Sequence, residues 1–210
     1  MLTVAAFALS GCLDNMYPTA TTEPDWGKCN DGGGEPYSAH YCQTDNELLR
    51  VALDNDDDSD IDLKRFEVET QMISSVLDQQ FSPTDLVVEW ESPVYTGDAE
   101  TDIIYQWDTL DAEVLGTAWC NDAKNDTYEC DQHYVRFNSD NNPTGKLVCH
   151  ETGHAVGLTH GENANPVTAN DDPVLGCMTT DNALSSLLGE QNVKMINDTY
   201  PHPSEDDGNA

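Results

Sequence analysis

Positive charge is scarce in this sequence. Eight lysines and arginines stand against 40 aspartates and glutamates, which gives a formal net charge of −32 at pH 7. A nucleic-acid-binding protein neutralises phosphates with lysine and arginine, so this balance excludes nucleic acid as a partner. Such self-repulsion costs stability at low salt but keeps a protein soluble where salt screens it. The composition therefore suits a salt-rich environment.

The sequence also lacks an internal repeat and, after its first residues, any apolar run long enough to span a membrane. Its 210 residues fit one domain with a sizeable core. We expect one folded domain over residues 38–203, followed by an acidic tail over residues 204–210. We expect the chain to act as a monomer.

The N-terminus carries an export pattern. Residues 2–9 are apolar, and residues 9–12, which read LSGC, resemble the bacterial lipobox, in which the cysteine is acylated. The resemblance predicts an export signal over residues 1–11, a lipid on Cys12, and a polar tether over residues 12–37. It implies a protein at a bacterial or archaeal cell surface that touches the membrane only through this lipid. No lysine or arginine precedes the apolar run, so a buried N-terminal strand or helix is the alternative.

An eleven-residue window that starts at His150 reads HETGHAVGLTH. His150 and His154 stand four residues apart, so on a helix they share one face and can bind one metal ion. Gly157 can adopt the left-handed conformation that ends a helix, which lets His160 return as a third ligand. Three neutral imidazoles hold zinc at about 2.0–2.1 Å and leave a fourth position open for water, as in catalytic sites. Glu151 is the candidate general base and acid.

Two plainer interpretations compete with a catalytic zinc site. The histidines could be surface residues of an ordinary helix, or the zinc could serve structure alone. The third histidine and the glycine at the required spacing disfavour the first interpretation. A structural site usually closes with four protein ligands, and no fourth cysteine or histidine follows at a suitable spacing.

The extended motif resembles that of the metzincin clan of zinc endopeptidases, and the segment Cys177-Met178-Thr179-Thr180 looks like the methionine turn of that clan. In the clan this methionine forms an apolar floor beneath the metal. The resemblance assigns that role to Met178, and an ordinary core methionine is the alternative. Gly153 and Leu158 are similar to the corresponding residues of matrixins, but matrixins usually carry serine where this chain has Gly161. The resemblance indicates the clan and leaves the subfamily open.

The pattern of elements is similar to that of a metzincin catalytic domain over about residues 40–200. This resemblance implies an α+β fold in which a small, twisted, mixed sheet packs on an N-terminal helix and the zinc-binding helix, with a C-terminal helix after them. The helices are expected over residues 62–80, ended by Ser82-Pro83, from Pro143-Thr144 to Gly157, and from near Gly189. Runs rich in β-branched and aromatic residues predict strands at 86–90, 103–107, 116–119 and 134–138.

The resemblance also implies that the strand around residues 115–119 lies at the edge of the cleft, where an extended peptide can pair with it. The residues expected to contact substrate are Leu115, Gly116, Thr117, Ala118, Trp119, Thr179 and Thr180. A tryptophan beside a disulfide is also typical of a core, which is the alternative for Trp119.

Seven cysteines leave six once Cys12 is assigned to the lipid, and an even number suits disulfides in an oxidising compartment. Local pairing would join Cys29 to Cys42, Cys120 to Cys130 and Cys149 to Cys177, although the sequence does not choose among the connectivities. The last pair would tie the residue before the first zinc ligand to the residue before the methionine of the turn.

A run of acidic residues at positions 54–62 raises the possibility of a second metal, Ca²⁺. The run lacks the glycine and the glutamate that a calcium-binding loop carries at its sixth and twelfth positions. A solvated acidic loop is therefore the preferred interpretation.

Together these features predict an exported zinc endopeptidase that hydrolyses protein or peptide substrates. One zinc ion is held by His150, His154 and His160, and Glu151 acts as base and acid. Two alternatives keep the same residues: a catalytically silent surface protein that binds metal or peptide, and a zinc hydrolase that acts on amide bonds of the cell wall. The intact Glu151 disfavours the first, and substrate profiling separates the second.

Overall fold

The computed structural model describes residues 42–54, 63–95, 100–124, 129–163, 167–180 and 186–200. The predictions for Cys12, Cys29, the tether, most of the acidic run and the acidic tail lie outside these residues. Within the described ranges, no helix has the length and apolar character needed to cross a membrane.

A six-stranded sheet forms the centre of the structure, with five strands in the order β1-β6-β4-β2-β3. Strand β5 stands outside this order and pairs with β6. Every pair of strands is parallel except β5 and β6, which are antiparallel. The bounds are β1 Gln43–Thr44, β2 Leu48–Leu53, β3 Val87–Trp90, β4 Ile103–Asp108, β5 Gly116–Ala123 and β6 Glu129–Asn138. Among the described strands β5 pairs with β6 alone, so β5 forms an edge of the sheet. The expected mixed sheet is confirmed.

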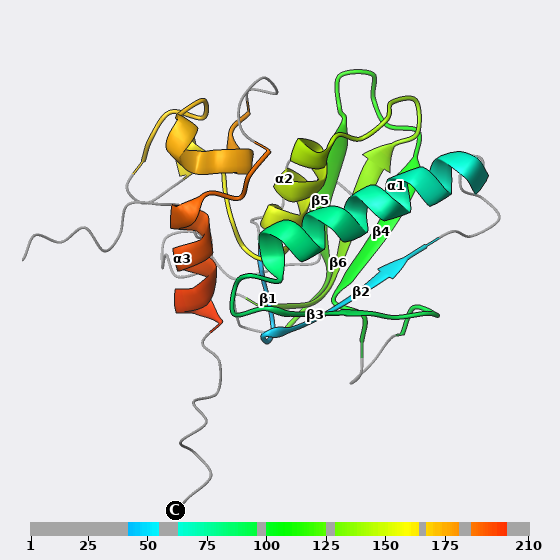
Figure 1. Ribbon diagram of the computed structural model, residues 1–210, viewed down its shortest axis with the longest axis horizontal. Coiled ribbons are helices and arrows are strands. Elements are labelled where there is room, and N and C mark those ends of the chain that lie inside the picture. The colour runs from blue at the N-terminus through cyan, green and yellow to red at the C-terminus, as the bar shows by residue number, and fades with distance from the viewer. Residues whose placement is uncertain are drawn as a thin grey trace, which may run out of the picture.

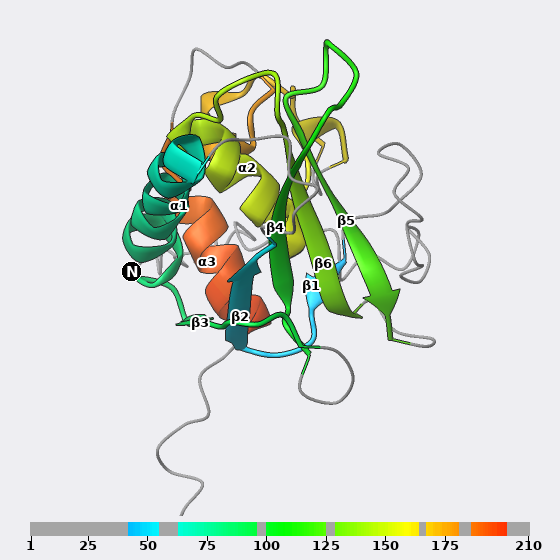
Figure 2. The same cartoon turned by 90° about the vertical axis from the view of Figure 1, so that its right-hand side faces the viewer.

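Helices α1 (Leu63–Val76) and α2 (Gly145–Ala155) lie on one face of the sheet (Figures 1 and 2). Helix α1 continues into a π-helical turn, Leu77–Phe81, that ends at Ser82, as the sequence predicts. Helix α3 (Glu190–Thr199) starts after Gly189, also as predicted, and contacts the 3₁₀ turn at Pro173–Met178.

The core fills the space between these helices and the sheet. Its largest fully buried side chains are Tyr105, Phe81, Phe137, Leu49, Ile73, Leu77, Ile103, Leu158, Leu175, Met178 and Leu188. The hydroxyl groups of Tyr105 and Thr152 lie 2.9 Å apart, so a hydrogen bond joins strand β4 to helix α2 inside this core. Helix α2 is therefore held firmly against the sheet.

Two strands were missed by the sequence prediction. Strands β1 and β2 precede α1, so the predicted order of helix before strands is wrong. Strand β2 lies inside the sheet between β3 and β4, and its side chains are apolar apart from Arg50, so the alternation that marks a half-buried strand is absent. Strand β1 has only two residues and gives no pattern. Strand β6 also begins five residues earlier than the predicted start at residue 134.

Two of the three predicted disulfides are confirmed. One joins Cys120 of β5 to Cys130 of β6, and the other joins Cys149 of α2 to Cys177. Cys42 is also disulfide-bonded, but its predicted partner Cys29 lies outside the described residues. Disulfides of this kind are typical of an oxidising, extracellular environment.

Candidate metal centre and adjoining cavity

Helix α2 and the chain reversal after it bring three histidines together. The side chain of Thr144 caps the helix by accepting a backbone N–H of the first turn, and Gly157, at a φ of 94°, ends it. The Nε2 atom of His150 lies 3.0 Å from that of His160 and 3.1 Å from that of His154. The remaining pair, His154 and His160, is 3.2 Å apart. The three ring nitrogens therefore converge on one point.

Hydrogen bonds on the far side of two rings decide which nitrogen carries the proton. Nδ1 of His150 lies 2.8 Å from the carbonyl oxygen of Cys177, and Nδ1 of His154 lies 2.8 Å from that of Leu158. A carbonyl oxygen only accepts, so both Nδ1 atoms donate an N–H, and each Nε2 keeps a lone pair. Lone pairs that face one another at this distance repel, and a cation between them removes the repulsion.

The site fits a metal ion in size and in protonation. An ion bound at about 2.0–2.1 Å in tetrahedral geometry holds its nitrogen ligands about 3.3 Å apart, close to what is observed. Burial lowers the pKa of His150 to about 4 and holds the pKa of His154 well below its ordinary value, so both rings are neutral. Neutral imidazole is the form that binds a metal. Within the described residues, these three histidines are the one group of side chains placed to hold a metal ion.

Met178 packs behind helix α2, which carries His150 and His154. Its side chain is fully buried, and its sulfur would collide with a Cβ atom at position 153. Gly153 therefore allows the methionine to approach the helix at the residue just before His154. This position agrees with the predicted apolar floor, which stays a prediction.

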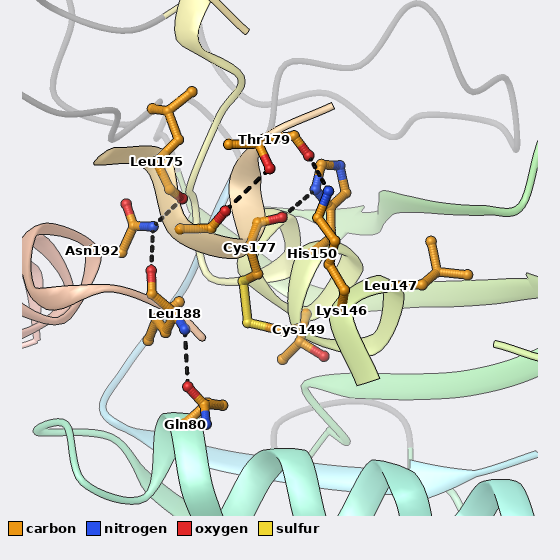
Figure 3. Close-up of a disulfide and its surroundings, with 12 residues drawn as sticks. Gln80, Lys146, Leu147, Cys149, His150, Leu175, Cys177, Thr179, Leu188 and Asn192 are labelled. Atoms are coloured by element: carbon orange, nitrogen blue, oxygen red, sulfur yellow. Dashed lines mark hydrogen bonds between the residues drawn. A yellow bond between two sulfur atoms is a disulfide. The ribbon is translucent and has the colours of Figure 1, made fainter. Parts of the chain in front are cut away.

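Cys177 is bonded to helix α2 in two ways (Figure 3). Its sulfur is bonded to Cys149, the residue before His150, and its carbonyl oxygen accepts the hydrogen bond from His150. Its own N–H donates to the carbonyl oxygen of Leu187 at 2.7 Å. Both cysteines are fully buried. The turn before Met178 is thus fixed to the helix beside the first ligand.

Glu151 is buried next to the ligands, with 5% of its surface exposed. It lies against Gly116 of β5, where an added Cβ atom would stand 3.1 Å from its Cγ and 3.2 Å from its Oε1. Burial raises the pKa of the Glu151 carboxyl group to about 8 when no cation stands beside it. A metal ion held by the histidines acts in the opposite direction, because a positive charge favours the carboxylate.

A cavity of about 240 Å³ opens beside Glu151 and two of the histidines. The lining residues are Glu113, Val114, Leu115, Gly116, Lys146, Leu147, His150, Glu151, His160, Thr179 and Thr180. Four of the predicted substrate-contacting residues, Leu115, Gly116, Thr179 and Thr180, are among them. The structure thus brings predicted residues from the start of β5 and from the turn after Met178 to the candidate metal centre.

The other three predicted contacts, Thr117, Ala118 and Trp119, do not line this cavity. Side chains alternate along a strand, so Thr117 and Trp119 point away from the face on which Gly116 meets α2. Trp119 packs on Tyr134, with ring centroids 5.3 Å apart, and is 6% exposed. Trp119 is therefore buried, which agrees with the alternative prediction of a core residue.

The sequence prediction missed four lining residues, Glu113, Val114, Lys146 and Leu147, of which Lys146 is the one that carries a positive charge. It is 6% exposed, and its Nζ donates to the carbonyl oxygen of Thr179 at 2.8 Å (Figure 3). A signal for it exists, because it stands four residues before His150 and so shares the ligand face of α2.

Gly161 has a structural reason for its departure from the matrixin pattern. A Cβ atom at this position would stand 2.6 Å from the carbonyl oxygen of Ala169. The carbonyl oxygen of Gly161 also accepts the N–H of Thr168 at 2.9 Å. The chain returns so closely onto the residue after His160 that a serine does not fit there.

No protein-family model matches this chain, and no curated protein matches it. Function is therefore inferred from the histidines, Glu151 and the cavity they share.

Proposed function

We propose that this protein is a zinc-dependent endopeptidase with a metzincin-like catalytic domain. One observation carries the proposal. The Nε2 atoms of His150, His154 and His160 converge on one point, and the buried carboxyl group of Glu151 lines the same cavity as His150 and His160. A metal site and a group able to move a proton therefore meet where a substrate can enter.

The donor set favours a catalytic zinc ion. Three imidazole nitrogens suit zinc, and no fourth protein ligand joins them within the described residues, so one position stays open. When bound there, zinc supplies a Lewis acid that polarises a carbonyl group and acidifies water.

The residues of the chain supply the remaining chemistry. Glu151 accepts the proton of the attacking water at its carboxylate and delivers it to the leaving nitrogen. The carbonyl oxygens of Cys177 and Leu158 keep the rings of His150 and His154 in the orientation that presents Nε2. The burial of Glu151 limits competing water around its carboxylate.

The edge strand β5 supports a peptide as substrate. Its first residue, Gly116, lines the cavity beside Glu151, and within the described residues β5 pairs only with β6. An extended peptide can add to such an edge through main-chain hydrogen bonds, which would carry it past Glu151. We place this activity outside the cytoplasm, where disulfides persist, with the lipid on Cys12 as part of the same proposal.

Metal analysis combined with proteolysis tests the proposal. We expect one zinc ion per chain, cleavage of an unfolded protein substrate, loss of cleavage with a chelator, and recovery when zinc is returned. Glu151→Ala, with Glu151→Gln as the isosteric variant, should retain zinc and lose cleavage. An unchanged cleavage rate in either variant would falsify the role of Glu151. A zinc-loaded wild-type protein that cleaves no peptide bond would overturn the assignment as an endopeptidase.

A further inference from the structure

Lys146 brings a positive charge into the cavity beside the metal centre. Among the described residues that line the cavity it is the only lysine or arginine, and the whole chain has only eight. Most lysines hold their ammonium group in water, whereas this side chain is 94% buried, since only 6% of it is exposed. Its charge therefore acts in a space where water screens it weakly.

The helix that carries Lys146 and a hydrogen bond to Thr179 fix the position of the ammonium group. Lys146 lies one helical turn before His150, so it shares the face of α2 that carries the ligands. Nζ donates to the carbonyl oxygen of Thr179, which ends the turn after Met178 (Figure 3). A lysine held in this way loses little freedom when it meets an anion.

The surroundings of Lys146 suit a short acidic side chain. Leu147, Val114 and Leu115 provide apolar surface within the same cavity, and Thr180 adds a hydroxyl group. An ammonium group that a carboxylate reaches in such a place forms a charge-assisted hydrogen bond, which is about twice as strong as a neutral one. Glu113, the other carboxylate of the lining besides Glu151, is exposed, so water screens its charge.

We propose that Lys146 makes this cavity selective for a carboxylate on the substrate residue next to the cleaved bond. The inference rests on the proposed function and names the substrate class of that site. The carboxylate belongs either to a glutamate or aspartate side chain or to the C-terminus of a peptide. Lys146 is a specificity-determining residue in this view and takes no part in the proton transfers of Glu151.

Matched peptides test the selectivity. One pair places Glu or Gln at the first residue on each side of the cleaved bond, and a second pair ends one residue after that bond as a free acid or as an amide. We expect kcat/KM of the wild-type enzyme to favour the carboxylate over its neutral partner by at least about tenfold. Preference within the first pair assigns the side chain, and preference within the second assigns the chain end.

Three variants separate charge from folding. Lys146→Met should abolish the preference, and Lys146→Arg should keep most of it. Lys194→Met is the control, because Lys194 is exposed on α3 and pairs with Asp198 away from the cavity. Metal content and thermal unfolding of each variant show whether it folds. Equal cleavage of the paired peptides by the wild type, or a preference that survives in Lys146→Met, overturns the proposal.

A binding measurement keeps this result apart from that of the proposed function. Glu151→Gln, loaded with zinc, should bind the Glu peptide more tightly than the Gln peptide by fluorescence anisotropy, and the additional change Lys146→Met should remove the difference. Absence of any cleavage by the wild type with this binding difference intact overturns the endopeptidase and leaves the carboxylate site. Cleavage by the wild type without a binding difference supports the endopeptidase and overturns the carboxylate site.

Discussion

The carbonyl oxygen of Cys177 accepts a hydrogen bond from Nδ1 of His150 at 2.8 Å, while the sulfur of the same residue is bonded to Cys149. Cys177 therefore orients the candidate ligand His150 through its backbone and is linked to the neighbouring residue Cys149 through its side chain. The disulfide holds the carbonyl group of Cys177 close to the ring of His150. The orientation of His150 in the candidate metal site therefore depends on the disulfide.

Removal of this disulfide should weaken metal binding. Cys149→Ser/Cys177→Ser should lower the free energy of unfolding by about 2–4 kcal/mol and also raise the dissociation constant for zinc, because His150 loses a fixed acceptor. The matched control is Cys120→Ser/Cys130→Ser, which removes a disulfide between two strands. Chelator competition and urea unfolding measure the two effects. Equal loss of zinc affinity in both double variants would contradict the connection.

Gly153→Ala should disturb the packing of Met178 on α2. The new methyl group collides with the buried methionine sulfur, and we expect a loss of about 1–3 kcal/mol in stability together with weaker zinc binding. Gly145→Ala is the control on the same helix, since its Cβ atom would meet only Val76, at an ordinary 3.7 Å. Thermal unfolding with and without zinc compares the two. Equal unfolding temperatures of both variants, with and without zinc, would show that Met178 has room to move.

Gly161→Ser, which introduces the residue that matrixins usually carry, should weaken zinc binding. The serine Cβ atom would press on the carbonyl group of Ala169, so the segment after His160 must shift. We expect lower zinc affinity, with most of the fold unchanged by circular dichroism. An unaltered zinc affinity would mean that the segment around Ala169 moves without effect on His160.

His133 and Asp102 should influence the pH dependence of stability in opposite directions. Burial lowers the pKa of His133 from 6.5 to about 4 and raises the pKa of Asp102 from 3.8 to about 7. The contribution of His133 is complete above pH 6.5 and is lost as the pH falls to about 4. The contribution of Asp102 is complete below pH 3.8 and is lost as the pH rises to about 7.

Between about pH 4 and 6.5 these two contributions oppose each other. Relative to the wild type, His133→Gln should therefore lose stability as the pH rises through this window, by up to about 1.4 kcal/mol per pH unit. Asp102→Asn should gain stability over the same window with a similar slope. Urea unfolding at several pH values, with a chelator present to remove effects of metal release, measures both slopes. Parallel curves for all three proteins would contradict the assignment.

The sequence predicted those parts of the site whose geometry is local. His150, His154 and His160 converge because helical spacing and a glycine stop determine their positions within eleven residues. Contacts between segments that are distant in the sequence could not be predicted from it. The reason for Gly161 lies at Ala169, and the role of Lys146 in the cavity depends on Thr179.

Among the strands too, local sequence patterns were predictable and pairing with neighbours was not. The runs that became β3 to β6 carry β-branched and aromatic residues between turn residues, and the sequence located all four. Strand β2 is an apolar run that helices also contain, and only its neighbours β3 and β4 make it a strand. The edge position of β5 follows from pairing and from no property of its own residues.

The hydrogen-bond acceptors of His150 and His154 imply an order of assembly. His154 bonds to a carbonyl group four residues away, so it is oriented as soon as the chain turns at Gly157. His150 waits for a carbonyl group 27 residues further along, which arrives only when Cys177 docks on α2. We therefore expect the rings of His154 and His150 to be oriented in two stages as the chain folds, with the disulfide between Cys149 and Cys177 stabilising the second stage. We expect a reduced chain to hold His150 less firmly than an oxidised one, which would tie assembly of the candidate metal centre to the redox state of its compartment.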